Sequence, residues 1–554
     1  MPTLVSLNVG MPRDIGFHGE TVHTGAWKDP VDGARLVRRL GVEGDGQGDT
    51  YGHGGPNRAV LVYQVESYRY WEQQLRRDHL PPGSFAENLT VTGLDDQEVC
   101  IGDRYRIGEA EFEVSQPRVT CFRAGLRIGE PQLAALLVAH HRPGFYMRVL
   151  TEGRVRAGDE IVRIAEGPGR VSVAAVDALL YLPDRDPDTL RRAVRIPALS
   201  PGWQNSLRQL LEGAASPAPA PAWPGFRPLR ITDVVPESST VTSIHLADPD
   251  GRPLPPARAG QHLPVRVPAG VRSYSLSSAP GADRYRISVK REPQGVVSGY
   301  VHAALRSGVE IEAAAPRGDF VLDDGDGPVV LVSAGIGITP VLAMLHELVE
   351  SGSAREVWWL HADRRPDDEP FASETRALLA RLPRVHARSF HSTGPSGRLT
   401  ADRIAELGLP ADAGAYICGP ATFMTDMAAA LRAAGLVNVH SETFGTLAPS
   451  RPGIVDRVRR APHVPDGPAG DGPIVTFTRS GVTAPFDRRG SLLDFAEACD
   501  VPARWQCRSG VCRTCETPLL AGAVDYAPAP LEAPAPGTVL LCCARPRTEL
   551  VVDM

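Results

Sequence analysis

Hydrophobic positions change their period along this chain, and each change predicts a different kind of element. Over residues 1–165, short runs of alternating polarity lie between Gly, Asp and Pro residues and predict β-strands, for example at 59–63 and 89–92. Apolar residues at helical spacing interrupt them once, at 66–78. After the β-rich part, helical spacing continues up to residue 212. We therefore expect a β-rich N-terminal domain at 1–165 and a helical appendix at 166–212.

The remainder of the chain divides at two stretches of linker composition. Pro/Ala-rich residues 213–224 predict an extended linker, and they suggest a movable joint. Alternating runs at 225–325 predict a small antiparallel barrel. Continuous apolar runs followed by helical spacing predict a parallel α/β domain at 326–445. A second linker, rich in Pro, Gly and Arg, is expected at 446–472, and a C-terminal domain at 473–554.

The C-terminal domain contains the most specific motif. Cys507, Cys512 and Cys515 follow a Cys-x4-Cys-x2-Cys spacing, and Cys542 and Cys543 lie further downstream. This spacing is typical of plant-type [2Fe–2S] ferredoxins. A zinc ribbon or inert buried thiols are the alternatives, but zinc sites favour two Cys-x2-Cys pairs and only one occurs here. In these ferredoxins two residues separate the fourth Cys from a larger side chain, and the resemblance implies Cys542 as that ligand. Adjacent strand residues point to opposite faces, so only one of the two thiols is expected to face the cluster.

Composition limits the kind of protein that carries this motif. The 554 residues suggest about four domains. A net charge of −6 gives no reason to expect nucleic acid or an anionic membrane as partner. We find no apolar run long enough to span a bilayer and no signal peptide. Nine cysteines, four of them in the cluster motif, fit a reducing cytosol better than a disulfide framework, so we expect a soluble cytoplasmic protein.

Glycine-rich loops of the N-terminal domain contain candidate anion-binding residues. Glycines or turn residues lie near Arg58, Arg118 and Arg123, whose guanidinium groups and neighbouring backbone N–H groups could hold an anionic group. Cys121 lies in the same polar loop as Arg118, where a thiolate could be favoured. Cys100, by contrast, is interpreted as a core residue.

Five of these runs resemble a known family. The stretches 44–47, 53–58, 85–90, 101–103 and 116–121 resemble the MOSC (molybdenum cofactor sulfurase C-terminal) domain, in particular the branch that confers resistance to N-hydroxylated purines. The resemblance implies a β-barrel-like domain with a small helical appendix, a molybdopterin cofactor, and Cys121 as the molybdenum ligand. A soft thiolate suits this metal. Members of the family reduce N-hydroxylated compounds such as hydroxylamines and amidoximes to amines.

Two short motifs in the predicted barrel suit a flavin. In the first, Arg272 could bind phosphate, Tyr274 could stack on the flavin ring, and Ser275 could hydrogen-bond near its reactive nitrogen. In the second, Gly295 and Ser298 begin a predicted helix whose N-terminus could take a phosphate. Each motif is weak alone, but the two in order, with the next one, are a strong signal.

A glycine loop follows the first apolar run of the α/β domain. Strand, glycine loop and helix together bring backbone N–H groups to a pyrophosphate. The whole region resembles the ferredoxin–NADP reductase superfamily, in particular its flavohaemoglobin branch. The resemblance implies contacts to flavin from the barrel motifs, with FAD favoured and FMN still open, and a position for Phe444 near the hydride path. It also implies contacts to NAD(P)H from Gly335, Gly337, Thr339, Pro340, Cys418, Gly419 and Pro420. Arg364 and Arg365 could bind the ribose phosphate of NADPH or be two solvated arginines, so NADH and NADPH remain alternatives.

The chemistry of these groups fixes one order of electron flow. NAD(P)H gives a hydride to the flavin, the [2Fe–2S] cluster carries single electrons, and a molybdenum site collects two for the substrate. We expect a self-contained NAD(P)H-dependent oxidoreductase that reduces N-hydroxylated or N-oxygenated small molecules. Two alternatives remain. Residues 223–554 could serve a separate electron-accepting partner such as an oxygenase, with the N-terminal domain as a docking module. The N-terminal domain could instead carry or deliver the cofactor.

Overall fold

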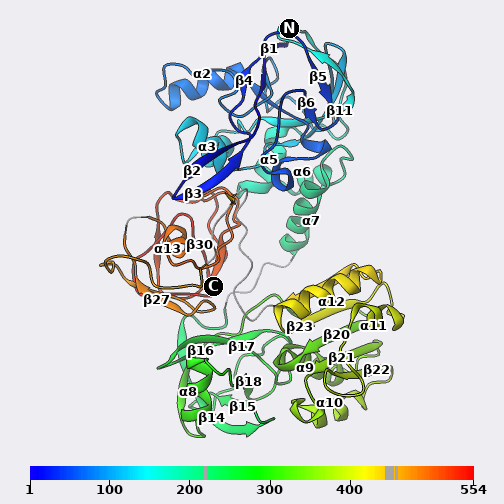
Figure 1. Cartoon of the computed structure of the whole chain (residues 1–554), viewed down its shortest axis with the longest axis vertical. Helices are drawn as coiled ribbons and strands as arrows, with labels where there is room; N and C mark the ends of the chain where they lie inside the picture. Colours follow the sequence, from blue (N-terminus) through cyan, green and yellow to red (C-terminus); the bar gives the residue numbers. More distant parts are fainter. Residues whose placement is uncertain (216–220, 443–453, 456–459, 489) are drawn as a thin grey trace.

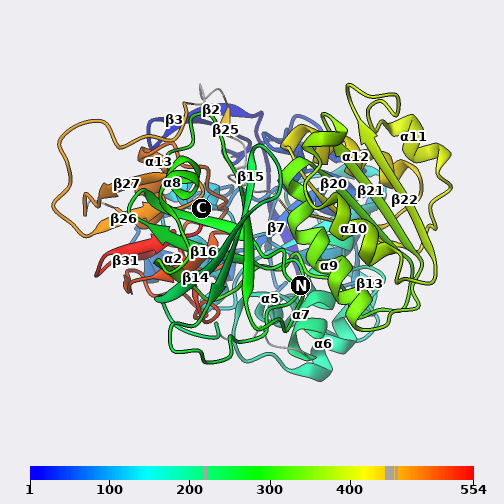
Figure 2. The ribbon, with the colours of Figure 1, turned by 90° about the horizontal axis from the view of Figure 1, so that it is seen from below.

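The computed structural model describes residues 1–215, 221–442, 454–455, 460–488 and 490–554, so the predicted Phe444 lies outside the described residues. The N-terminal domain and the helical appendix occupy one end of the long axis, and the barrel and the α/β domain occupy the other (Figure 1). The C-terminal domain lies between the two ends (Figure 1). Seen from below, the barrel and the α/β domain lie side by side (Figure 2). The predicted multi-domain β and α/β fold class is confirmed.

The N-terminal domain is built on a mixed sheet that curves into a nearly closed barrel. In the described residues its strands pair in the order β13-β9-β10-β11-β7-β8-β1-β4. The N–H groups of Leu4 and Ile161 donate to the carbonyls of Asp159 and Pro2, both at 2.9 Å, and connect the two ends of the sheet. The strands are β1 (Thr3–Val9), β4 (Asp29–Pro30), β7 (Val60–Gln64), β8 (Leu89–Thr92), β9 (Arg104–Ile107), β10 (Ala110–Pro117), β11 (Phe145–Thr151) and β13 (Ile161–Ala165).

A hairpin extends from this barrel and receives a strand from far along the chain. Strand β25 (Ile454–Val455), inside the predicted second linker, pairs with β3 of the hairpin. Two residues are too few to give a hydrophobic period, which is why the sequence predicts only a linker there. The hairpin strands are β2 (Arg13–Phe17) and β3 (Glu20–Thr24), and a separate small sheet contains β5 (Arg35–Arg38), β6 (Gly41–Val42) and β12 (Gly153–Val155).

Helices follow the predicted spacing with small differences in length. The predicted helix at 66–78 ends early, because the chain turns into the left-handed region at Arg76 (φ 52°). Helix α5 begins where the side chain of Ser172 accepts a hydrogen bond from the N–H of Ala175. Helix α7 continues past the predicted end of the appendix at 212. The helices of this half are α1 (Thr50–His53), η1 (Pro56–Arg58), α2 (Val65–Gln74), α3 (Phe122–Ile128), α4 (Leu133–Ala139), α5 (Val173–Tyr181), α6 (Pro187–Val194) and α7 (Pro201–Ala215).

The barrel is an antiparallel sheet with a single helix packed against it in the described residues. Its strand order is β17-β16-β19-β14-β15-β18. Every second side chain of each strand points inward, and these side chains form a common core with residues of the helix. The elements are β14 (Phe226–Pro236), β15 (Val241–Ala247), β16 (His262–Val267), β17 (Gly270–Ser275), β18 (Tyr285–Lys290), α8 (Val296–Ala304) and β19 (Glu310–Ala314).

The α/β domain contains a parallel sheet in the order β22-β21-β20-β23-β24. Helices α9 and α10 cover one face and α11 and α12 the other, which explains why its central strands are apolar on both sides. Its elements are β20 (Val329–Ala334), η2 (Gly335–Gly337), α9 (Ile338–Glu350), β21 (Val357–Asp363), η3 (Pro366–Asp368), α10 (Ala372–Leu379), β22 (Val385–His391), α11 (Ala401–Glu406), β23 (Gly414–Cys418), α12 (Ala421–Ala433) and β24 (Asn438–Glu442).

The C-terminal domain packs one helix against a mixed sheet in the order β27-β26-β32-β28-β30. A capping box between Ser491 and Asp494 begins the helix. The elements are β26 (Ile474–Phe477), β27 (Val482–Pro485), α13 (Leu492–Ala498), β28 (Glu516–Ala521), β29 (Val524–Tyr526), β30 (Thr538–Leu540), β31 (Ala544–Pro546) and β32 (Leu550–Val552). Among the described residues of the whole chain, no helix has both the length and the apolar character to cross a membrane.

Candidate functional site

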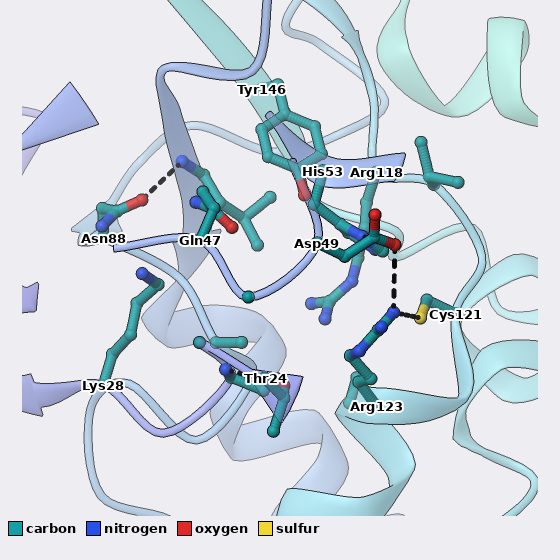
Figure 3. A pocket seen from close by; sticks show the side chains of 17 residues that line it. Thr24, Lys28, Gln47, Asp49, His53, Asn88, Arg118, Cys121, Arg123 and Tyr146 are labelled. Carbon is teal, nitrogen blue, oxygen red and sulfur yellow. Dashed lines mark hydrogen bonds and ion pairs between the residues drawn. The ribbon is translucent and has the colours of Figure 1, made fainter. Parts of the chain in front are cut away.

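Cys121 lies in the N-terminal domain, between the end of strand β10 and the start of helix α3. It is the N-cap residue of the helix, with an extended backbone (φ −145°), and only 5% of it is exposed. Its side chain lines a cavity that also receives residues from the connection after β3, from the loop before α1, and from β11 (Figure 3). The strand-to-helix turn therefore places a buried sulfur at the wall of a cavity.

Charged groups surround this sulfur. Nη1 of Arg123 lies 3.4 Å from Sγ of Cys121 and 3.6 Å from Oδ2 of Asp49 (Figure 3). Nδ1 of His53 lies 3.4 Å from the same carboxylate oxygen. Burial raises the pKa of Cys121, but the charges of His53 and Arg123 outweigh burial and lower that pKa to about 6. Cys121 is therefore mostly a thiolate at neutral pH.

The same contacts act on the partners of the thiolate. Burial opposes the charged form of His53, but the Cys121 thiolate and the nearby Asp49 carboxylate together raise the pKa of His53. The contact with His53 in turn lowers the pKa of Asp49. Cys121, Asp49, His53 and Arg123 thus form a compact network of four side chains, in which thiolate and carboxylate lie against imidazole and guanidinium.

The predicted arginines have different positions. Arg118 is buried and lines the cavity, and its Nη1 donates to the carbonyl of Phe85 at 2.5 Å. Arg58 does not line the cavity, and its Nη1 donates to the carbonyl of Gly52 instead. The structure therefore brings Arg118 and Arg123 to Cys121, whereas Arg58 supports a neighbouring loop.

Other cavity residues were not identified from the sequence. His53 begins the 53–58 run and Asp49 follows the 44–47 run, so the sequence indicates these loops, but their proximity to Cys121 depends on tertiary contacts. Asn88 belongs to the 85–90 run, but Lys28 and Tyr146 come from segments that contain no motif. Only the packing of the barrel brings these segments together.

Four cysteines meet in the C-terminal domain. The side chain of Cys507 contacts those of Cys512 and Cys542, and Cys515 contacts Cys542. The backbone N–H groups of Ser509 and Cys512 both donate to Sγ of Cys507 at 3.4 Å. Such N–H···S bonds stabilise the thiolates that an iron–sulfur cluster requires.

The neighbouring cysteine is oriented differently. Sγ of Cys543 faces the carbonyl of Leu540 at 3.7 Å, and the residue is fully buried. In the described residues, no three His, Cys, Asp or Glu side chains surround a position for a single metal ion. A [2Fe–2S] cluster does not need such a position, because its four thiolates are divided between two irons.

The predicted flavin residues lie on two neighbouring elements of the barrel. Arg272, Tyr274 and Ser275 are on β17, and Gly295 and Ser298 are at the start of α8. Nη1 of Arg272 donates to the carbonyl of Thr478 in the C-terminal domain at 3.0 Å. Burial raises the pKa of Tyr274 to about 12, so its phenol remains neutral. Oγ of Ser298 donates to the carbonyl of Gly295 at 3.2 Å and so fixes the first turn of the helix.

The predicted nucleotide loops meet at the carboxyl ends of two adjacent parallel strands. The first loop follows β20 and the second follows β23, and the strand order changes direction between them, which is where α/β sheets bind ligands. A Cβ atom on Gly337 would lie 2.4 Å from the carbonyl oxygen of Cys418, so the loops touch. Thr339 and Pro340 lie in the first turns of α9, and Gly419 and Pro420 precede α12. Burial raises the pKa of Cys418, so its thiol remains neutral.

Known proteins resemble the chain domain by domain. The sequence model for the MOSC domain matches residues 49–162. The YflK protein of Bacillus subtilis (strain 168) is 38% identical over 204 residues, which are 37% of this chain and 92% of YflK. The chain belongs to the MOSC-domain proteins. Three more sequence models match this MOSC-domain protein: a YiiM-like 3-alpha helix domain at 171–214, an oxidoreductase NAD-binding domain at 331–429, and a 2Fe-2S iron-sulfur cluster binding domain at 475–547.

The second half of the MOSC-domain protein is similar to reductases. A flavohemoprotein of Deinococcus radiodurans is 41% identical over 229 residues, 38% of this chain and 56% of the relative, so the chain spans little more than half of that relative. The structure of phthalate dioxygenase reductase is 29% identical, covers 60% of this chain and 98% of that chain, and gives a TM-score of 0.38. The family matches and the similarity to flavohemoproteins show that the protein joins a MOSC domain to an oxidoreductase module of flavin, NAD and [2Fe–2S] domains, in the predicted order.

The C-terminal domain, now identified as the ferredoxin domain, contacts the MOSC domain closely. Cys507 belongs to the same buried core as the MOSC barrel. Cys121 and Phe122 belong to a second core with Cys542. The rings of Phe122 and Trp505 meet edge to face, with centroids 5.1 Å apart. Hydrophobic packing is thus continuous between the cluster cysteines and the Cys121 loop.

On its other side the ferredoxin domain contacts the barrel. Asp553 is fully buried and accepts hydrogen bonds from Nη2 of Arg479 at 2.9 Å and from Oγ of Ser273 at 3.4 Å. Nε2 of His262, on β16, lies 3.4 Å from the same carboxylate. With the bond from Arg272, these contacts connect the ferredoxin domain to the strands that carry the predicted flavin residues.

Proposed function

We propose that the protein is an NAD(P)H-dependent reductase of N-hydroxylated compounds. Electrons would pass from NAD(P)H to FAD, then to the [2Fe–2S] cluster, and finally to a molybdenum site at Cys121. The reaction would add two electrons and two protons to a hydroxylamine or amidoxime, break its N–O bond, and release an amine-type product and water. FAD is preferred to FMN because the flavohemoproteins are similar over the barrel and α/β domain.

One observation carries this proposal. The ferredoxin domain contacts the barrel through Asp553 and the MOSC domain through the packing around Cys507 and Phe122. An iron–sulfur domain between a two-electron donor and a second redox site is the arrangement that such a chain of carriers requires. A reductase for a separate partner would instead need its cluster surface available to that partner.

The residues around Cys121 fit a molybdenum cofactor. The buried thiol has a pKa lowered to about 6, so a soft anionic ligand is available at neutral pH. Arg118 and Arg123 lie in the same cavity and could hold the phosphate of the pterin. When bound, the metal would supply the two-electron reduction at the N–O bond. His53 and Asp49 hold Arg123 and the thiolate in place, and burial excludes water from the sulfur.

A variant of the thiol tests the proposal. Cys121→Ala protein should lose NADH-dependent reduction of hydroxylamine and keep NADH-dependent reduction of cytochrome c, because the flavin and cluster remain. Molybdenum analysis of wild type and variant should show about one metal per wild-type chain and a loss in the variant. Hydroxylamine reduction that is unchanged in Cys121→Ala would overturn the proposal.

A further inference from the structure

The helical appendix contacts the ferredoxin domain, beside the cluster loop, through a forked ion pair. Nη1 and Nη2 of Arg185 donate to the two carboxylate oxygens of Glu532 at 2.8 and 2.7 Å. Nε of Arg185 donates at 2.8 Å to the carbonyl of Leu179, in the last turn of α5, so the fork is held in a fixed direction. Both side chains are about four-fifths buried, with exposures of 20% and 19%. Such a pair is screened far less than a surface ion pair.

Glu532 continues this contact into the cluster loop itself. Nη1 of Arg513 lies 3.1 Å from Oε2 of Glu532, and Nε of Arg513 donates to Glu516 at 2.8 Å. Arg513 directly follows the cluster cysteine Cys512 in sequence. A guanidinium of the appendix is therefore connected, through one carboxylate, to the loop that holds three of the four cluster cysteines.

A buried tyrosine of the same appendix packs against the cluster loop. Tyr181, the last residue of α5, is 8% exposed and belongs to the same packed core as Cys507 and Val511. Its ring meets Trp203 of α7 edge to face, with centroids 5.9 Å apart. The hydroxyl of Thr120, the residue before Cys121, faces its phenol. Tyr181 thus lies between the cluster cysteines and the Cys121 loop.

We propose that the helical appendix is the docking platform for the ferredoxin domain, with Arg185 and Tyr181 as positioning residues that hold the cluster loop against the Cys121 loop. This inference rests on the proposed function for its electron-transfer consequence. It assigns a role to residues 166–212, for which the sequence indicates only core packing. It also implies that the cluster stays docked on the MOSC domain, although a Pro/Ala linker precedes the reductase module.

The test compares Arg185→Ala with a matched control in the full-length holoprotein. The control is Arg191→Ala, an arginine of the same appendix that is 59% exposed and pairs with Asp188, one helical turn away, at 2.7 Å. Anaerobic stopped-flow measurements follow reduction of the cluster by NADH and its re-oxidation by hydroxylamine. Amide hydrogen exchange of residues 507–516 follows docking directly. Tyr181→Leu is measured in the same way, with Tyr181→Phe as its conservative variant.

Arg185→Ala leaves Glu532 without its forked partner, and truncating one member of a buried charge pair weakens binding by about tenfold or more. We expect about that slowing of cluster re-oxidation, faster exchange at 507–516, and unchanged reduction by NADH. Arg191→Ala and Tyr181→Phe should behave as wild type, and Tyr181→Leu as Arg185→Ala. Wild-type exchange at 507–516 in both Arg185→Ala and Tyr181→Leu overturns the docking role. If hydroxylamine fails to re-oxidise the wild-type cluster, the proposed function fails, and exchange alone decides the docking role.

Discussion

The charge state of Cys121 gives the sharpest prediction of the site. Its pKa of about 6 lies well below the ordinary value of 9.0, and the difference corresponds to about 4 kcal/mol of preference for the thiolate. A hydrogen bond to a charged group contributes about 1.5–3 kcal/mol. Replacing Arg123 by Gln removes one such bond, at 3.4 Å, together with its positive charge. We therefore expect Arg123→Gln to raise the pKa of Cys121 by about 1–2 pH units.

The assay is alkylation of molybdenum-free protein by iodoacetamide across the pH range, with each cysteine followed by peptide mass spectrometry. Thiolates react and thiols do not, so the pH at which the alkylation rate is half its maximum gives the pKa. Arg127→Gln is the matched control, since Arg127 is on the same helix but donates to the carbonyl of Lys28 at 3.0 Å. Cys499, whose pKa burial raises to about 12, is the internal control. A wild-type midpoint near the ordinary thiol value, or an unchanged midpoint in Arg123→Gln, would refute the reasoning.

The same titration has a consequence for stability. The pKa of Cys121 is lower in the folded chain than in the unfolded chain, so its thiolate contributes stability that is present above the ordinary thiol pKa. That contribution is lost as the pH falls through about 6. In the molybdenum-free protein, the MOSC domain of Cys121→Ser should therefore lose less stability than that of wild type as the pH is lowered.

Three further predictions concern other parts of the chain. Cys542→Ser should lose the [2Fe–2S] absorbance and iron, whereas Cys543→Ser should keep both; the opposite result would exchange their roles. Burial raises the pKa of Asp96 to about 7, above the value of 3.8 expected for the unfolded chain, so wild type loses stability as the pH rises from about 4 to about 7. Asp96→Asn should therefore melt similarly to wild type at about pH 4 and at a higher temperature at about pH 8, and parallel melting curves would contradict this. In Gly337→Ala, a Cβ atom 2.4 Å from the carbonyl of Cys418 should separate the nucleotide loops and raise KM for NADH, and a wild-type KM would be inconsistent with their contact.

Local patterns in the sequence predict the elements well, for physical reasons that are visible in the structure. Helix α5 begins after Ser172, because that side chain caps it, and its apolar spacing continues to its last residue. The apolar run of β20 is explained by helices on both faces of its sheet. The cysteine spacing indicates the cluster because three of its ligands share one short loop.

Contacts between distant segments could not be predicted in this way. Arg185 and Glu532 are separated by 347 residues, and neither belongs to a motif. His53 and Asp49 lie on a different segment from Cys121, and glycine-rich composition indicates that segment without indicating that they lie near the thiol. Strand β25 is too short to give a period. Each of these depends on how domains and loops pack, which a single sequence does not encode in any local pattern.

The most direct test of electron transfer from the cluster to a molybdenum site uses one anaerobic experiment. Full-length protein of known molybdenum content is reduced with one equivalent of NADH, hydroxylamine is added, and the paramagnetic signal of the reduced cluster is followed together with ammonia. We predict that wild type loses the signal and forms one ammonia per NADH, while Cys121→Ser keeps the signal and forms none. A reduced cluster that persists in molybdenum-containing wild type after hydroxylamine is added would contradict the account.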